Sequence, residues 1–161
     1  MAVKGRKARK SVADNAPSSP YEVDMTATAE AVYKTLYRQA KEGQCADYTS
    51  AHITTFEMVK GAVKQIIPND PLNRKYALRG QLSNIFRLKK GRMRICWIAS
   101  SKMRRVCILF VSETLRKEGD ANDPYVILQN MVDSGTFDAI FTQFGVRMPK
   151  LRGQSPTDKP Q

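Results

Sequence analysis

Hydrophobic positions in the central part of the chain follow two different periods. Between residues 26 and 67, apolar side chains recur every three or four positions, which predicts two amphipathic helices. Between residues 82 and 115 the period shortens to two, which predicts strands. These strands span 82–90, 92–100 and 105–115, with tight turns at Gly91 and near residues 100–103.

Local signals place the ends of the remaining elements. Residues 21–25 alternate and predict a short strand, after which Thr26 resembles a helix N-cap. Gly43 is expected to end the first helix. Pro68 and the turn at Pro71 are expected to end the second, which runs over 50–67. Asp123 followed by proline predicts an N-cap and a helix from residue 124. Residues 136–145 add a further helical turn or two.

This order predicts an α+β fold. A small, mostly antiparallel sheet, made of the N-terminal strand and a three-stranded meander, packs on an N-terminal helical hairpin, and a C-terminal helix follows. With both hairpin helices on one face, the other face is expected to be free as a charged surface. The predicted organisation is a disordered basic arm (1–20), a folded domain (21–145) and a disordered basic tail (146–161).

Positive charge is concentrated in the predicted meander. The chain carries a formal net charge of +12. Residues 84–117 alone contain ten Lys and Arg against the single acidic residue Glu113. Charge focused on one element indicates a binding surface for a polyanion, and nucleic acid is the first expectation. Alternation puts Arg87 and Lys89 on one face of their strand and Arg92 and Arg94 on one face of the next. Protection of a sheet edge is the alternative explanation for such charges.

Other chemistry-bearing residues have ordinary structural explanations. Three cysteines, Cys45, Cys96 and Cys107, have no metal-ligand spacing and fit small buried side chains in a cytoplasmic protein. No apolar run is long enough for a membrane span. Trp97 is expected in the core, His52 outside any active site and Glu113 in an ion pair. An acidic loop that could bind a metal contains Glu118, Asp120, Asn122 and Asp123, but the N-cap of the next helix explains Asp123 without a metal.

Two segments resemble the RelE/ParE superfamily of toxins from bacterial toxin–antitoxin pairs. They are "YEVDMTATAEAVYKTL" and "KYALRGQLSNIFRLKKGRMRICWIASSKMRRVCILFVSETLRKE". They match the superfamily's first strand with its Thr before an alanine-spaced helix, its basic hairpin around a glycine, and its last strand with a terminal basic pair. The resemblance covers roughly residues 20–135 and is closest to RelE-like members.

The resemblance implies a set of site residues. Arg87, Lys89, Arg94 and Arg116 correspond to catalytic positions. Lys89 is the expected base or charge stabiliser, Arg87 and Arg94 would hold the scissile phosphate, and Arg116 would stabilise the transition state or protonate the leaving group. The expected RNA contacts outside this set are Lys90, Arg92, Lys117 and Tyr125, the last a possible counterpart of the superfamily's C-terminal tyrosine.

The resemblance also implies a function. A RelE-like chain would be a cytoplasmic endoribonuclease that cleaves mRNA on the ribosome without a metal or cofactor, inhibiting translation and growth. Its partners would be a cognate antitoxin, mRNA and the ribosome, with a possible higher-order toxin–antitoxin complex and no membrane. Two alternatives stay open: a ParE-like DNA gyrase inhibitor without nuclease activity, and a non-catalytic RNA-binding module.

Overall fold

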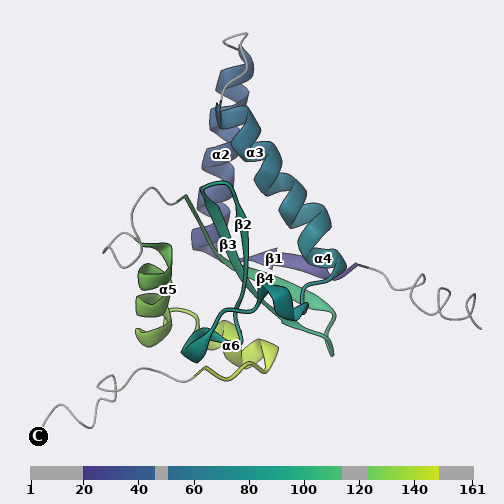
Figure 1. Cartoon of the computed structure of the whole chain (residues 1–161), viewed down its shortest axis with the longest axis vertical. Helices are drawn as coiled ribbons and strands as arrows, with labels where there is room; N and C mark the ends of the chain where they lie inside the picture. Colours follow the sequence, from purple (N-terminus) through teal and green to yellow (C-terminus); the bar gives the residue numbers. More distant parts are fainter. Residues whose placement is uncertain (1–19, 46–50, 114–122, 149–161) are drawn as a thin grey trace, which may run out of the picture.

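The computed structural model describes residues 20–45, 51–113 and 123–148. Within these residues four strands form one sheet in the order β1-β4-β3-β2 (Figure 1). The strands are β1 (Glu22–Met25), β2 (Phe86–Lys90), β3 (Met93–Ser100) and β4 (Arg105–Glu113). Strands β2, β3 and β4 pair antiparallel as the predicted meander, and β1 pairs parallel to β4. The predicted α+β class with a mostly antiparallel sheet is confirmed.

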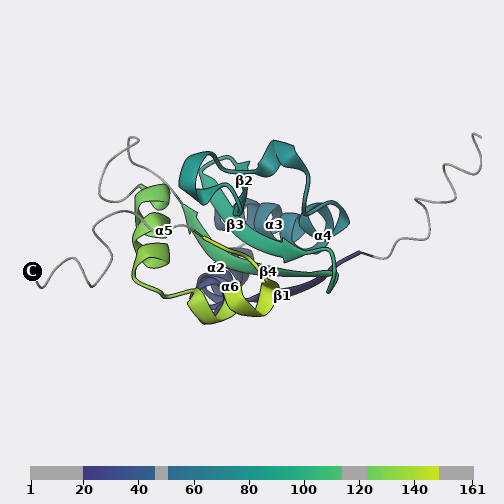
Figure 2. The same cartoon turned by 90° about the horizontal axis from the view of Figure 1, so that it is seen from below.

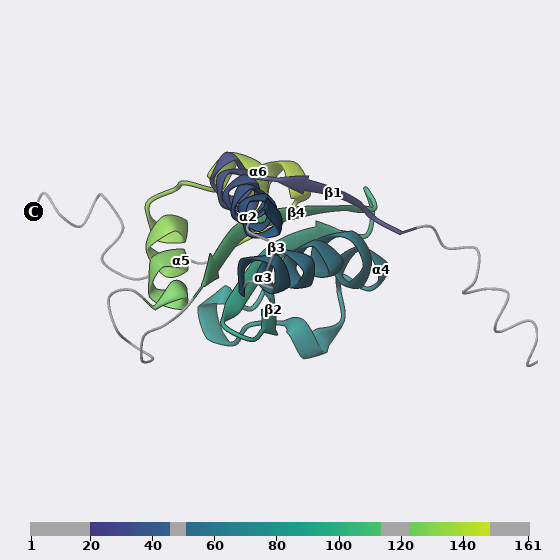
Figure 3. The same ribbon diagram turned by 90° about the horizontal axis from the view of Figure 1, so that it is seen from above.

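The two N-terminal helices form the predicted hairpin. Helix α2 (Ala27–Cys45) and helix α3 (Ala51–Gly61) lie side by side, and both extend beyond the sheet (Figures 1 and 3). Thr26 caps α2 as expected, because its Oγ1 accepts a hydrogen bond from the backbone N–H of Ala29 at 3.1 Å. The same hydroxyl donates to the carbonyl oxygen of Leu109 in β4 at 3.0 Å. Thr26 therefore fixes the start of the hairpin on the sheet.

Both helices continue past their predicted ends. Helix α2 includes Gly43, since one interior glycine weakens a helix by about 1 kcal/mol without ending it. After α3 the chain forms a π-helical turn, η1 (Ala62–Ile66), and a short helix, α4 (Ile67–Asn69). Pro68 lies in the first turn of α4, where its missing N–H needs no helical partner. The helical path ends at Asn69, directly before the predicted turn at Pro71, so that turn and not Pro68 itself ends it.

The first strand of the meander is shorter than predicted. Two 3-10 turns, η2 (Arg74–Tyr76) and η3 (Gly80–Leu82), precede it, and strand β2 begins only at Phe86. The backbone N–H of Leu78 donates to the carbonyl oxygen of Ile85 at 3.0 Å, which closes the loop around η3. Leu82 is buried although it lies in the turn η3 and not in a strand, so its apolar side chain does not indicate a strand at this position.

Hydrophobic cores lie on both faces of the sheet. Toward α2 and α3, the core contains Phe86, Leu88, Met93, Ile95, Trp97, Val106, Ile108 and Val111. Toward α5 (Pro124–Asp133) and α6 (Asp138–Phe144), it contains Cys96, Ile98, Cys107, Leu109 and Phe110 from the strands. The prediction of a wholly free second face is therefore wrong. All five of these strand residues are apolar or cysteine, and such a face has to be covered by other elements.

The C-terminal helices are arranged as the local signals indicate. The side chain of Asp123 accepts a hydrogen bond from the N–H of Tyr125 at 2.8 Å, so Asp123 is the predicted N-cap of α5. Figure 2 shows α5 at the left and α4 at the right of the molecule, with the sheet between them. Val146 and Met148 pack on the second core, so the folded part continues three residues past 145.

The predictions for Trp97 and for two of the cysteines are confirmed. Trp97 is fully buried, and its Nε1–H donates to the carbonyl oxygen of Pro71 at 2.9 Å. Cys96 and Cys107 are free and buried. In the β3–β4 register Cys96 pairs with Phe110 and Cys107 with Ile98, so the two cysteines are not cross-strand partners.

Candidate nucleic-acid interface

Three basic side chains share one face of the β2–β3 hairpin. Lys89 lies directly opposite Arg94, and Arg87 lies opposite Cys96. Alternation along each strand directs all three to the side of the sheet that carries α5 and α6. We call Arg87, Lys89 and Arg94 the cationic strip. It occupies the part of this face next to the hairpin turn, where the strands carry polar rather than apolar residues.

The cationic strip carries an energetic cost in the protein alone. Like charges directly opposite each other on antiparallel strands destabilise a sheet, by roughly 0.2–1 kcal/mol. Lys89 and Arg94 are such a pair, and Lys89 is exposed. A bound anion would relieve this repulsion. The arrangement therefore favours an anion-binding surface over a purely protective sheet edge.

Helix α5 brings a tyrosine to the strip. The Nη1 of Arg87 donates a hydrogen bond to the phenolic oxygen of Tyr125 at 3.0 Å. The guanidinium carbon also lies 5.7 Å from the centre of the Tyr125 ring, within cation–π distance. The N-cap by Asp123 and the proline at the first helical position fix the start of α5, and hence the place of Tyr125. Strip and tyrosine thus come from separate elements that meet in the fold.

Arg94 is held against the hairpin turn. Its Nη1 donates to the carbonyl oxygens of Gly91 at 2.9 Å and Met93 at 3.0 Å. Gly91 has φ of +58°, a left-handed value that glycine adopts without strain. These bonds fix the direction of the guanidinium and leave it part-exposed. Arg94 therefore stabilises the turn in addition to carrying charge on the strip.

The thiol beneath the strip is protonated near neutral pH. Burial raises the pKa of Cys96 to about 12, although the guanidinium groups of Arg87 and Arg94 act to lower it. A thiol with such a pKa is not a nucleophile under physiological conditions. Arg87 lies opposite Cys96 in the strand register and Arg94 lies two residues before it in β3, so both arginines flank the thiol on one face.

Not all of the predicted site residues join the strip. Lys90 lies opposite Met93 and alternates to the side of α2 and α3. Arg92 is in the two-residue turn with Gly91 rather than in a strand, because β3 begins at Met93. The expectation that Arg92 and Arg94 share a strand face is therefore wrong. Arg116 and Lys117 lie outside the described residues.

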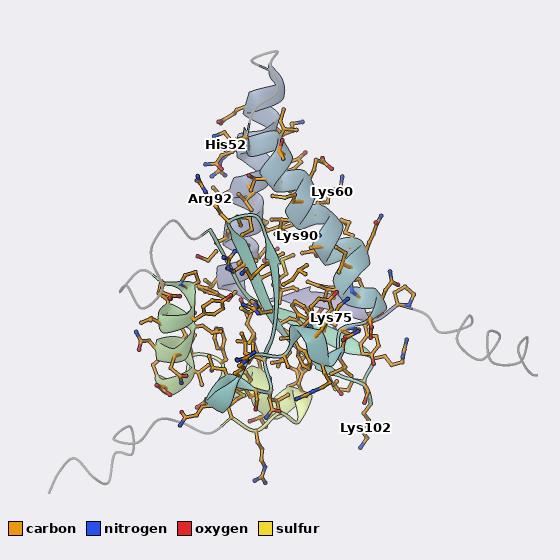
Figure 4. All side chains as sticks on the ribbon, in the orientation of Figure 1. His52, Lys60, Lys75, Lys90, Arg92 and Lys102 are labelled. Carbon is orange, nitrogen blue, oxygen red and sulfur yellow. The ribbon has the colours of Figure 1, made fainter. Side chains whose placement is uncertain are left out.

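The other candidates lie away from the strip or outside the described residues. His52 is exposed near the far end of the helical hairpin (Figure 4). Glu118, Asp120 and Asn122 are not among the described residues. The part of the chain that the structure describes contains no group of three or more His, Cys, Asp or Glu side chains able to hold a metal ion. None of its helices is long and apolar enough to cross a membrane.

One polar residue next to the strip was not singled out from the sequence. Ser112 in β4 pairs with Arg94 across the β3–β4 ladder. It extends the polar part of this face by one strand. Because residues 106–111 are all apolar, no alternation assigns Ser112 to a face, and its place next to the strip follows only from the β3–β4 register.

Comparison with known protein families decides the family. A model for toxins with endonuclease activity, of toxin-antitoxin systems, matches residues 22–146. The chain belongs to this YhaV toxin family. The toxin–antitoxin origin and the nuclease class expected from the sequence are thereby confirmed, and the alternatives without nuclease activity are not favoured. As the toxin of such a system, it has an antitoxin as its partner.

Solved structures similar to the toxin come from other toxin–antitoxin systems. The RelBE2 toxin–antitoxin complex from Mycobacterium tuberculosis is 22% identical, with a TM-score of 0.43, and covers 60% of this chain and 100% of that one. The isolated E. coli RelE toxin is 15% identical, with a TM-score of 0.44, and covers 70% and 98%. A comparison with curated proteins gives no match.

Proposed function

We propose that the toxin is a cytoplasmic endoribonuclease that cleaves mRNA, on the ribosome and without a metal, at the cationic strip and Tyr125. The observation that carries this proposal is the contact between Arg87 and Tyr125 beside the opposed Lys89–Arg94 pair. It supplies, on one part-exposed surface, cations for a phosphate and a hydroxyl able to exchange a proton.

RNA cleavage at such a surface follows from the chemistry of the 2′-hydroxyl. A base removes the 2′-OH proton, the 2′-oxygen attacks phosphorus, and the bond from phosphorus to the 5′-oxygen breaks. A donated proton neutralises the leaving 5′-oxygen, and the products are a 2′,3′-cyclic phosphate and a 5′-hydroxyl end. The pentacoordinate phosphate carries additional negative charge, which preorganised cations stabilise.

Each member of the strip has a role in this scheme. Arg87 and Arg94 bind the phosphate oxygens, because guanidinium groups form paired hydrogen bonds with them and remain charged. Lys89, exposed between them, is the base or the charge stabiliser. Arg116, at the position implied by the resemblance, stabilises the transition state or protonates the leaving group. Tyr125 accepts from Arg87 and so keeps its own proton available for a phosphate or leaving oxygen.

Induction in growing cells tests the proposal. Growth and mRNA cleavage, mapped by primer extension, are compared for the wild-type chain, an Arg94→Ala, Arg116→Ala double variant and an Arg87→Ala variant. Lys90→Ala is the matched control, since Lys90 is basic and adjacent but lies on the opposite side of the sheet. The purified chains are then assayed on RNA with and without EDTA and ribosomes.

The expected result is growth arrest with cuts in translated messages for the wild-type chain and the control. Both effects should be lost in the other two variants, and purified activity should persist in EDTA and require ribosomes. Because Arg94 also binds the hairpin turn, loss of activity counts only where circular dichroism shows an intact fold. Full cleavage by the double variant would refute the site, and growth arrest without RNA cuts would refute the substrate.

A further inference from the structure

The helical hairpin carries an apolar groove, and two of its lining residues, Met25 and Tyr33, also pack against the first core. The groove lies between α2 and α3, is also lined by β1 and η1, and has a volume of about 510 Å³. Its floor is made by Met25, Tyr33, Tyr37 and Phe56. Figure 1 shows α2 and α3 extending beyond the sheet, and Figure 3 shows them side by side. We call this depression the hairpin groove.

Aromatic side chains make the hairpin groove unusual for a solvent-facing surface. The ring centres of Tyr33 and Tyr37 lie 5.4 and 5.5 Å from that of Phe56, so the three rings form one cluster. Tyr37 is 49% exposed, and only one other large hydrophobic residue of the described chain, Met103, is comparably exposed. Contiguous exposed apolar area with aromatic residues is typical of protein-binding surfaces.

The hairpin groove is long enough for a helix. A neighbouring hollow shares Met25, Tyr33 and Lys64 with it and continues to β1 and Pro68. Another shares Tyr37 and Phe56 and continues toward Ile53 and Ala40. From Met25 to Ala40 the lining follows α2, a path of about 20 Å, or about four helical turns. An amphipathic helix of that length would fill it.

The rim of the groove selects the charge of the occupant. Four lysines, Lys34, Lys41, Lys60 and Lys64, border the groove and its extension, against Glu30 and Glu57. Glu30 lies 3.5 Å from Lys34 and offsets part of its charge. The net charge of the rim is therefore positive. Lys64 also belongs to the π-helical turn η1, an irregularity that is frequent at functional sites.

Charge argues against the occupants that the chain itself could supply. Residues 1–19 contain Lys4, Arg6, Lys7, Arg9 and Lys10 against Asp14, so this segment would be repelled by the lysine rim. A second copy carries the same net charge of +12. RNA is disfavoured because the floor is apolar and two glutamates border it. An acidic protein helix satisfies both the floor and the rim.

We propose that the hairpin groove is the docking site for an acidic amphipathic helix of the antitoxin. The inference rests on the toxin's place in a toxin–antitoxin pair, and it gives that partner a surface separate from the cationic strip. Apolar side chains of the helix would cover Tyr33, Tyr37 and Phe56, and its carboxylates would face Lys60 and Lys64. The antitoxin would thus be bound at the hairpin groove independently of any contact that it makes with the cationic strip.

A matched pair of double variants of the full-length chain tests this site. The groove variant carries Tyr37→Ala and Lys60→Glu. The control carries Met103→Ala and Lys102→Glu, the same kind of change at exposed positions of the β3–β4 turn, at the opposite end of the molecule from His52 (Figure 4). The probe is the antitoxin, identified as the protein whose co-expression restores growth to cells producing the wild-type chain. Its affinity is measured by calorimetry at two salt concentrations.

The groove variant should bind the antitoxin at least about tenfold more weakly, and the control within about twofold of the wild-type chain. RNA cleavage without antitoxin should be the same in all three chains. Lys60→Glu alone, at an exposed position, should weaken antitoxin binding at low salt. Its difference in affinity from the wild-type chain should become smaller as the salt concentration rises. This single variant keeps the test decisive if the double variant folds poorly.

Several outcomes would overturn the proposal. Unchanged antitoxin affinity in the groove variant would exclude the groove as a docking site. Loss of RNA binding with antitoxin affinity retained would make it a nucleic-acid surface. A dimer in sedimentation that only the groove variant dissociates would make it a self-association surface. By contrast, failure of the wild-type chain to cleave RNA would overturn the proposed RNA substrate and leave the docking proposal standing, provided that antitoxin binding still depends on the groove.

Discussion

Arg87 in β2 and Tyr125 in α5 are 38 residues apart in the chain and joined by a hydrogen bond of 3.0 Å between Nη1 and the phenolic oxygen. The arginine also lies over the tyrosine ring, at 5.7 Å from its centre. One contact thus couples the basic strand to the start of a helix whose cap is formed by Asp123. The position of α5 determines whether the cationic strip has a phenolic hydroxyl beside it.

Removal of the Tyr125 hydroxyl separates proton transfer from binding. Tyr125→Phe keeps the ring for the cation–π contact with Arg87 but loses the hydrogen bond. We expect single-turnover RNA cleavage to fall by about 10²-fold or more, with RNA affinity changed by less than about threefold. Tyr125→Ala should weaken affinity as well. If Tyr125→Phe cleaves at the wild-type rate, the hydroxyl has no role in the chemistry.

Neutralisation of Lys89 should affect stability and binding in opposite directions. Lys89→Met removes the like charge opposite Arg94, so the free energy of unfolding should be unchanged or rise by up to about 1 kcal/mol. RNA affinity should fall, and the slope of log affinity against log salt should become shallower by about one unit. Lys90→Met, the neighbour on the other side of the sheet, is the control. Equal salt slopes for the two variants would contradict the strip as the RNA contact.

The two buried thiols make stability depend on alkaline pH. Burial raises the pKa of Cys96 to about 12 and that of Cys107 to about 11, where Asp24 contributes to the increase. Unfolded thiols ionise near pH 8.5–9, so between about pH 9 and 11 the unfolded state binds fewer protons than the folded state. The free energy of unfolding should therefore be unaffected by these thiols below pH 8 and fall as pH rises above 9.

Chemical denaturation of the wild-type chain and a Cys96→Ala variant across this range measures the effect. Each thiol contributes up to roughly 1.4 kcal/mol per pH unit while only the unfolded form ionises. The variant loses stability at pH 7 from the smaller side chain, but its stability should decline less steeply with pH. Parallel curves for the two chains would show that Cys96 ionises equally in both states.

The Thr26 hydroxyl should be important for the attachment of the helical hairpin. It accepts from the N–H of Ala29 and donates to the carbonyl oxygen of Leu109, so it both caps α2 and ties it to β4. Thr26→Ala should lower the free energy of unfolding by about 1–2 kcal/mol. Thr26→Ser, which keeps the hydroxyl, should recover most of the loss. Thermal unfolding followed by circular dichroism provides the comparison. An unfolding midpoint of Thr26→Ala equal to that of the wild-type chain would show that the hydroxyl does not stabilise the attachment.

Local signals were sufficient for most of the element order. The change of hydrophobic period from about 3.6 to 2 identified the helical hairpin and the meander, because each periodicity fits only one backbone geometry. The Asp123–Pro124 pair identified the start of α5, since a capping carboxylate and a proline at the first helical position both act within one turn. The charge excess of residues 84–117 identified the strands that carry the strip.

Boundaries and faces were less predictable. Leu82 fits a strand pattern but is buried from a 3-10 turn, and Pro68 fits a helix end but lies inside α4. Arg92 fits strand alternation but lies in the turn with Gly91. In each case the residue is buried or exposed as its apolar or charged character predicts, while the backbone around it follows from the packing of neighbouring elements.

The sequence by itself determined the order of the main helices and strands, the α+β class and the location of the positive charge, because hydrophobic periods, helix caps and charge runs are all patterns of residues close in the chain. Only the tertiary structure decided that β1 pairs parallel to β4, that α5 and α6 cover the second face, and that Tyr125 meets Arg87. It also decided that Tyr33, Tyr37 and Phe56 line an open groove. Such contacts join segments far apart in the chain and depend on how their apolar faces pack together, which no local pattern encodes.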